Sequence, residues 1–251
     1  MINRNILIKS SKDCDLLLLD KNLQSEDLNV DGNNLLINAT IFGRPEFDNK
    51  RKYIAKLLEM GIDVNQKLKT GKTALHYACS QSDLITVKQL LEFGVDVNSV
   101  DENGKNALIY TCENIFLNFP RVINIKDIDE LGYSYNEYNQ LQNIYNKMYY
   151  DRKTKKRLFK NQLEIIEYLL GDGIDKNQTS KGKTALDFAV ENYHIKDTEM
   201  VEILDYYGVK MQQEHNEEFN YFDELFYGGI SIFVNDYSDY KLKVKKLKKI
   251  S

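Results

Sequence analysis

The 251-residue sequence has little of what several classes of protein require. Its three cysteines and three histidines do not stand at the spacing of zinc ligands, so we expect no metal site and no cofactor. The longest aliphatic run, residues 16–19, is far shorter than the roughly 20 residues that cross a bilayer. The formal net charge of −4 provides no basic excess for a nucleic-acid partner. The composition therefore predicts neither a membrane span nor nucleic-acid binding.

The N-terminus favours the cytosol, and two of the three cysteines stand at equivalent places in the sequence. Residues 1–10 lack an apolar core followed by a cleavage site, so we expect no signal peptide and a cytoplasmic protein. Cys79 and Cys112 stand 33 residues apart at equivalent places, where we expect them to pack as small core residues. Cys14 lies in a polar stretch, which leaves it open to exposure at the surface.

What the sequence does contain is a phrase that recurs at a fixed interval. Residues 70–79 read TGKTALHYAC, and residues 103–112, which lie 33 positions later, read NGKNALIYTC. A third copy, KGKTALDFAV, occupies residues 181–190. A second phrase, LLEMGIDVN at residues 57–65 and LLEFGVDVN at residues 90–98, has the same period of 33. Two phrases that share one period indicate stacked structural repeats.

Both phrases resemble the ankyrin repeat. Residues 71–78 differ from the Gly-x-Thr-Pro-Leu-His-x-Ala phrase of that family only by Ala74 in place of proline. The resemblance covers roughly residues 29–210. It implies an all-α solenoid of four to five repeats, in which each repeat is a turn followed by an inner and an outer helix. It also implies a protein that binds a protein partner and is not an enzyme.

Glycines bound four units in the sequence, at residues 32–61, 71–94, 104–173 and 182–208. The closing glycine of each is expected to be left-handed, as helix C-termini favour. The connections from closing to opening glycine are nearly constant, at 10, 10 and 9 residues. Extra residues must therefore lie between the two helices of a unit, about 6 in the first, 46 in the third and 3 in the fourth.

Three parts are expected along the chain. Residues 1–30 form a degenerate N-terminal capping half-repeat, residues 31–211 the repeats, and residues 212–251 a C-terminal extension. Residues 230–234 and 240–245 read as the strands of a β-hairpin that caps the last repeat. Alternatively, the six lysines between 241 and 249 contact an acidic partner or a membrane surface.

The insertion at about residues 113–160 is a tyrosine-rich helical arm, since it holds six of the 17 tyrosines. Tyr138, Leu141, Tyr145 and Met148 fall at helical spacing and predict an amphipathic helix. One interpretation is an arm that binds a partner, because tyrosine suits interfaces. The other is that the aromatic side chains pack the arm back onto the repeats, with the basic run at residues 151–157 as a solvated turn. Both can hold at once.

The resemblance implies binding through a concave face made of turn tips and inner-helix ends. The tip positions are Lys69, Thr70, Lys72, Glu102, Asn103, Lys105, Ser180, Lys181 and Lys183. The inner-helix ends add Ser80, Gln81, Glu113, Asn114, Glu191 and Asn192, and the arm adds Tyr138 and Tyr145.

Catalytic patterns are missing from the sequence. His76 stands where the other repeats have Ile109 and Asp187, so we expect it to brace the turn and the helix start. The Gly-Lys pairs lack the upstream glycine of a phosphate-binding loop. We therefore predict a non-catalytic interaction scaffold that is monomeric when free. The alternatives are an immunity protein that neutralises a toxin, a secreted effector acting on host proteins, or an enzyme hidden in the insertion or the extension.

Overall fold

The computed structural model describes residues 4–17, 34–42, 48–113, 125–132, 134–140, 143, 152–191 and 198–212. The chain divides into two units, residues 1–210 and 211–251. The predicted C-terminal hairpin lies outside the described residues, as do residues 18–33 of the predicted capping half-repeat.

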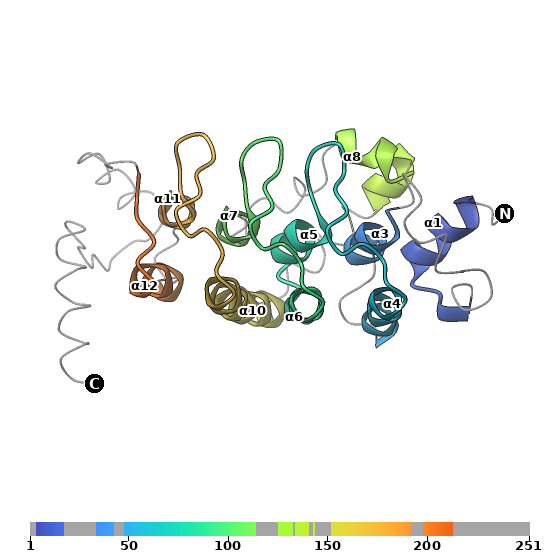
Figure 1. Cartoon of the computed structure of the whole chain (residues 1–251), viewed down its shortest axis with the longest axis horizontal. Helices are drawn as coiled ribbons and strands as arrows, with labels where there is room; N and C mark the ends of the chain where they lie inside the picture. Colours follow the sequence, from blue (N-terminus) through green and yellow to red (C-terminus); the bar gives the residue numbers. More distant parts are fainter. Residues whose placement is uncertain are drawn as a thin grey trace. The chain divides into compact units, whose positions relative to one another are not determined.

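Four helix pairs follow one another in the chain (Figure 1). The inner helices are α3 (Leu35–Phe42), α5 (Ala74–Ser80), α7 (Ala107–Glu113) and α11 (Ala185–Glu191). The outer helices are α4 (Asp48–Glu59), α6 (Leu84–Glu92), α10 (Arg152–Gly171) and α12 (Thr198–Tyr206). Inner helices pack on inner helices and outer on outer, in chain order, so the pairs stack as repeats 1 to 4. The described residues contain helices and turns, with one isolated β-bridge between Ser180 and Lys183, which confirms the predicted all-α solenoid.

Each outer helix ends in the same way. The closing glycines Gly61, Gly94, Gly173 and Gly208 have φ values of 84°, 74°, 82° and 73°. The residue after each glycine donates its N–H to the carbonyl five positions back, as from Val95 to Leu90 at 3.1 Å. Leu90 is fully buried and Val95 is 7% exposed, so an apolar contact accompanies the bond. This is the Schellman arrangement, in which glycine avoids the steric cost of a left-handed residue.

The N-terminal helix α1 (Arg4–Asp13) packs against α3 and extends the inner row. The residue after it, Cys14, is only 4% exposed, so the expectation of an exposed cysteine was wrong. Burial raises the pKa of the Cys14 thiol to about 11. The polar residues around it face inward with partners, because Ser10 Oγ donates to the Asp15 carbonyl at 3.0 Å and lies 3.2 Å from the Tyr53 hydroxyl.

The other two cysteines are core residues, as predicted. Cys79 and Cys112 are both fully buried in the inner row and unpaired. Burial raises the pKa of the Cys79 thiol to about 12 and that of Cys112 further.

The basic run at residues 151–157 was predicted as a solvated turn, and this was wrong from Arg152 onward. Helix α10 begins at Arg152 and continues without a break to the end of repeat 3. Leu158, Ile165 and Leu169 are buried at helical spacing. The first buried residue of this stripe is Leu158, directly after the basic run, so the basic residues form an additional, largely solvated first part of the helix.

Candidate functional site

The surface formed by the turn tips and the inner helices, here called the tip face, carries most of the predicted binding residues. Its tips are bonded to one another: Glu102 N–H donates to the Thr70 carbonyl at 2.8 Å, and Ser180 Oγ donates to the Asn103 carbonyl at 2.8 Å. Gly71 has a φ of 78°, and a Cβ there would lie 3.0 Å from the Asp101 Cα. The tips therefore form one continuous framework, and Gly71 is required both by its backbone and by the next tip.

The structure divides the predicted binding residues into groups by burial. Exposed positions are Lys69, Glu102, Asn103 and Lys181, and half-buried ones are Lys105, Glu113, Tyr138 and Lys183. Buried positions are Thr70, Lys72, Ser80, Gln81 and Ser180, which differs from their predicted place on an open surface. Asn114, Tyr145 and Asn192 lie outside the described residues, and Glu191 is described only as the last residue of α11.

The buried group is occupied by contacts within the chain. Ser80 Oγ donates to the Tyr77 carbonyl at 2.7 Å, and Gln81 Nε2 donates to the Ile41 carbonyl of the preceding repeat at 3.2 Å. These polar side chains bind the repeats to themselves and to each other. Thr70 and Lys72 are covered for a different reason.

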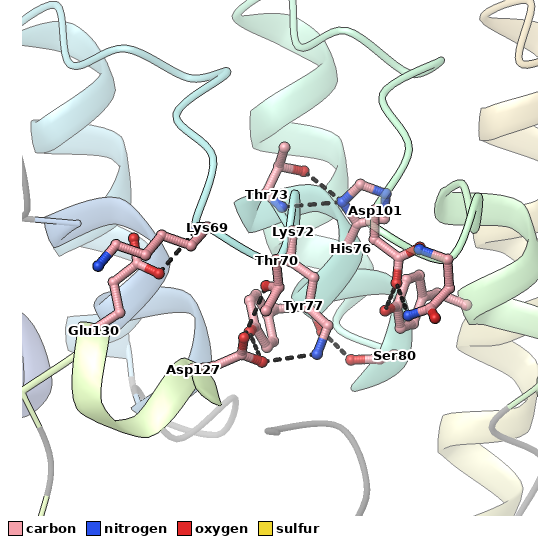
Figure 2. A network of polar contacts seen from close by, with 12 residues as sticks. Lys69, Thr70, Lys72, Thr73, His76, Tyr77, Ser80, Asp101, Asp127 and Glu130 are labelled. Carbon is pink, nitrogen blue, oxygen red and sulfur yellow. Dashed lines mark hydrogen bonds and ion pairs between the residues drawn. The ribbon is translucent and has the colours of Figure 1, made fainter. Parts of the chain in front are cut away.

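A helix of the insertion, α8 (Ile125–Glu130), sits on the tip of repeat 2. Figure 2 shows its Asp127 side chain pointing at three donors of that repeat. Asp127 is fully buried, with Oδ2 2.7 Å from Lys72 Nζ and 2.7 Å from the Tyr77 hydroxyl. Its Oδ1 accepts from Thr70 Oγ1 at 2.8 Å. We call Thr70, Lys72 and Tyr77 the carboxylate cradle.

Further contacts hold α8 and the residues after it. Glu130 Oε2 accepts from the Lys69 backbone N–H at 2.8 Å, and Lys12 Nζ donates to the Gly132 carbonyl at 2.9 Å. Ile128 and Leu131 are buried at 5% and 0% exposure. This part of the arm packs back onto the repeats through two carboxylates and two aliphatic side chains, whereas the interpretation from the sequence assigned that packing to the aromatic side chains.

The outer part of the arm faces solvent. Ser134 starts a short helix over residues 135–140, where its N–H and hydroxyl both bind Glu137 Oε2 at 2.8 Å. Tyr135 is 67% exposed, and its ring centroid lies 6.3 Å from that of Tyr138. The rest of the predicted amphipathic helix, apart from residue 143, lies outside the described residues.

The lysine of the Gly-Lys pair meets an aromatic ring in each of repeats 2 to 4. Lys72 lies 5.5 Å from the Tyr77 ring centroid, Lys105 5.7 Å from that of Tyr110, and Lys183 6.0 Å from that of Phe188. Lys105 Nζ also contacts both carboxylate oxygens of Glu113 at 2.6 Å. Repeat 3 thus supplies its own carboxylate, eight residues after the lysine, whereas the corresponding residue of repeat 2 is Ser80.

The sequence predictions missed Asp127 and Glu130. The available signal was this substitution: Lys72 has Ser80 where Lys105 has Glu113. Once the structure shows that Lys72 is buried, the missing Glu means that another segment must supply its carboxylate partner. The segment itself could not be named from the pattern.

His76 has the structural role predicted for it. Its Nδ1 accepts from the Thr73 N–H at 3.0 Å, so Nε2 carries the proton and donates to the Ser99 carbonyl at 3.1 Å. Burial lowers the pKa of His76 to about 4, although Asp101 opposes this shift. Asp187 takes the same place in repeat 4, where it accepts from the Thr184 N–H at 2.8 Å. The shared task is to hold the start of the inner helix.

The described residues contain neither a candidate metal site nor a candidate membrane span. No group of three or more His, Cys, Asp or Glu side chains within them could hold a metal ion. No helix among them is long and apolar enough to cross a membrane.

Comparison with known families is decisive for the repeats. Residues 47–125 match the family model of ankyrin repeats, in three copies. These residues are ankyrin repeats. Repeat 4 lies beyond the match, yet it has the same turn, helix pair and closing glycine. Ankyrin repeats generally mediate protein–protein interaction. No curated protein matches the chain.

Proposed function

We propose that the chain is a non-catalytic scaffold that binds a protein partner through the tips of repeats 3 and 4 and the outer part of the arm. The supporting observation is a difference between equivalent tips. Thr70 and Lys72 of repeat 2 are buried under α8, whereas Glu102, Asn103 and Lys181 of the next two tips are exposed. The exposed tips lie on the face through which ankyrin repeats bind proteins.

The hydrogen bonds between tips support a surface formed before binding. Gln178 Nε2 donates to the Gly104 carbonyl at 2.9 Å, and a Cβ at Gly104 would lie 3.1 Å from the Thr179 carbonyl oxygen. Neighbouring tips are therefore in backbone contact and have little room to rearrange. A preformed surface reduces the ordering cost of association.

The exposed Tyr135 and the half-buried Tyr138 support a second contact area on the arm. Tyr135 and Tyr138 stand on a capped helical turn, and tyrosine combines a large apolar ring with a polar hydroxyl. Such residues are enriched at protein interfaces. The anchoring of α8 by Asp127 and Glu130 fixes the base of this arm on repeat 2.

The proposal includes a monomeric chain in the cytosol that binds no nucleic acid. All three cysteines are unpaired, which suits a compartment where thiols stay reduced.

Cross-linking and capture from the native cells, followed by identification of the partner, test the proposal. The double variant N103A/K181A is expected to lose about ten-fold or more in affinity for the captured partner, since interface residues with large effects contribute over about 1 kcal/mol each. The control is K88A on outer helix α6, away from the tips. The Lys88 side chain is 37% exposed and its ion-pair partner Glu164 is 35% exposed, so the variant removes a surface charge outside the proposed interface. Equal capture by N103A/K181A, a Y135A/Y138A variant and wild type would contradict the proposed surface.

A further inference from the structure

Helix α8 contacts repeat 2 in the way that a bound peptide contacts its binding site. Asp127 and Glu130 are three positions apart and bind the carboxylate cradle and the Lys69 N–H, respectively. Ile128 and Leu131, one position after each acid, are buried. The helix thus presents an acidic pair at i and i+3 and an apolar pair at i+1 and i+4. Every donor to the two carboxylates named here belongs to the tip or the inner helix of repeat 2.

The cradle is made by the repeat, not by the insertion. Lys72 and Tyr77 occupy the positions of Lys105 and Tyr110 in repeat 3, where Glu113 of the same inner helix neutralises the lysine. In repeat 2 the Ser80 hydroxyl instead turns to the Tyr77 carbonyl. Repeat 2 therefore offers a positive, donor-rich place on the tip face that takes its carboxylate from a segment 55 residues away in sequence.

We infer that the carboxylate cradle is a recognition site for an acidic helical segment of a protein partner, and that α8 occupies it in the free chain. The inference rests on the proposed function, because the cradle belongs to the face through which the repeats bind protein. The segment it fits carries carboxylates at i and i+3 and apolar residues at i+1 and i+4.

Two properties favour an acidic segment as the occupant: its charge is opposite to that of Lys72, and a buried ion pair gains little net free energy, so it can be exchanged. Lys72 and Asp127 are 2.7 Å apart with side chains 8% and 0% exposed, so both charges are desolvated. A buried pair contributes little net stability, because the desolvation cost offsets most of the attraction. A partner carboxylate that binds the same three donors replaces the ion pair between Lys72 and Asp127 by an equivalent ion pair, at little net cost. The partner must compete with α8, which is tethered to the repeats at an effective concentration on the order of millimolar.

A peptide of residues 123–134, labelled with fluorescein, serves as the probe in trans. The receptor is the full chain with α8 emptied of its contacts, D127S/I128S/E130S/L131S, and binding is followed by fluorescence anisotropy. We expect this receptor to bind the peptide at least about ten-fold more tightly than the wild-type chain, in which α8 competes. Far-UV circular dichroism checks that the repeats remain folded, and the single variant D127N gives the same direction of change with less disturbance.

Two matched changes test the chemistry of the cradle. Adding K72Q to the emptied receptor should weaken peptide binding about ten-fold, whereas adding K88Q on the outer face should leave it unchanged. A peptide with asparagine and glutamine at positions 127 and 130 should bind at least about ten-fold more weakly than the acidic one.

Equal binding of the acidic and amide peptides, or no effect of K72Q on peptide binding, would overturn the inference. So would a wild-type dimer in solution that K72Q dissociates, because the occupant of the cradle would then be a second copy of the chain. If the peptide experiments overturn this inference but partner capture still depends on Asn103 and Lys181, the proposed function stands. Partner capture that is unchanged in N103A/K181A, while the peptide still binds the cradle, contradicts the proposed surface of repeats 3 and 4 instead.

Discussion

Replacing Lys50 by methionine is expected to destabilise the protein by about 3 kcal/mol, because it leaves the Asp83 carboxylate buried without its cation. Lys50 Nζ lies 2.7 Å from Asp83 Oδ2, with the two side chains 3% and 5% exposed. The ammonium also donates to the Thr40 carbonyl at 2.7 Å. The pair therefore joins both helices of repeat 1 to the start of outer helix α6.

The expected loss is at the lower end of the roughly 3–5 kcal/mol typical of a broken buried pair. Asp83 keeps two donors in the variant, since it accepts from Thr86 N–H at 3.2 Å and from Thr86 Oγ1 at 2.8 Å. These bonds cap α6 and offset part of the desolvation cost of the stranded charge. The double variant K50M/D83N should lose less than the sum of its single variants, because neither charge is then left alone.

Urea unfolding followed by circular dichroism and by tyrosine fluorescence measures these differences. Coincident transitions by the two probes justify a single free energy of unfolding for the stack. The control is K88M, which breaks the half-exposed pair between Lys88 and Glu164 at 3.8 Å and should cost under about 1 kcal/mol. A loss for K50M no larger than that for K88M would refute the reasoning.

The same pair predicts a dependence on pH. Burial pushes the pKa of Asp83 upward, but Lys50 and the two Thr86 donors outweigh it, so the pKa lies below its ordinary value. Because the folded pKa is below the unfolded value of about 3.9, the stabilisation is complete above that pH and is lost as the pH falls through the folded pKa. D83N should therefore be less sensitive than wild type to acid below about pH 4, as measured by thermal unfolding across pH.

Three further substitutions should change the stability in a direction that the structure determines. Asn38 is 1% exposed, and neither polar atom of its side chain has a hydrogen-bond partner. N38L should therefore raise the free energy of unfolding by about 1 kcal/mol, measured as a higher Tm. A lower Tm would contradict this prediction. G61A and G71A both place alanine at positive φ, 84° and 78°, but only Gly71 has backbone within 3.0 Å of the added Cβ. G61A should therefore cost about 1 kcal/mol and G71A clearly more in urea unfolding, and equal losses would count against the role of the contact with Asp101.

The parts of the fold that the sequence predicted are those that each repeat specifies locally. Leu57, Leu90, Leu169 and Leu204 stand four residues before a closing glycine and are all fully buried. One local pattern of apolar residue and glycine thus defines the end of every outer helix. The left-handed glycines that close the outer helices followed from the same pattern, because each stands directly after the apolar end of its helix.

The parts that could not be predicted depend on contacts between segments far apart in sequence. Cys14 is buried because α1 packs on α3 and Ser10 reaches Tyr53, 43 residues away. The docking of α8 depends on Asp127 meeting Lys72, and periodicity in one segment carries no information on its partner in another. The early start of α10 was missed for a different reason: the residues of the basic run precede the first buried residue, Leu158, so no apolar periodicity marks them as helical.

The three lysines of the Gly-Lys pairs show why binding residues cannot be transferred between repeats by register alone. Lys72 is buried against Asp127 of the insertion, Lys105 is held by Glu113 between the rings of Tyr110 and Phe188, and Lys183 lies half-buried over Phe188. Register gives all three the same backbone and the same neighbouring ring. The surroundings differ because the residue eight positions later is Ser80 in one repeat and Glu113 in the next. A carboxylate from elsewhere is therefore accepted at repeat 2, and the same chemistry that draws α8 there is what a partner would have to offer.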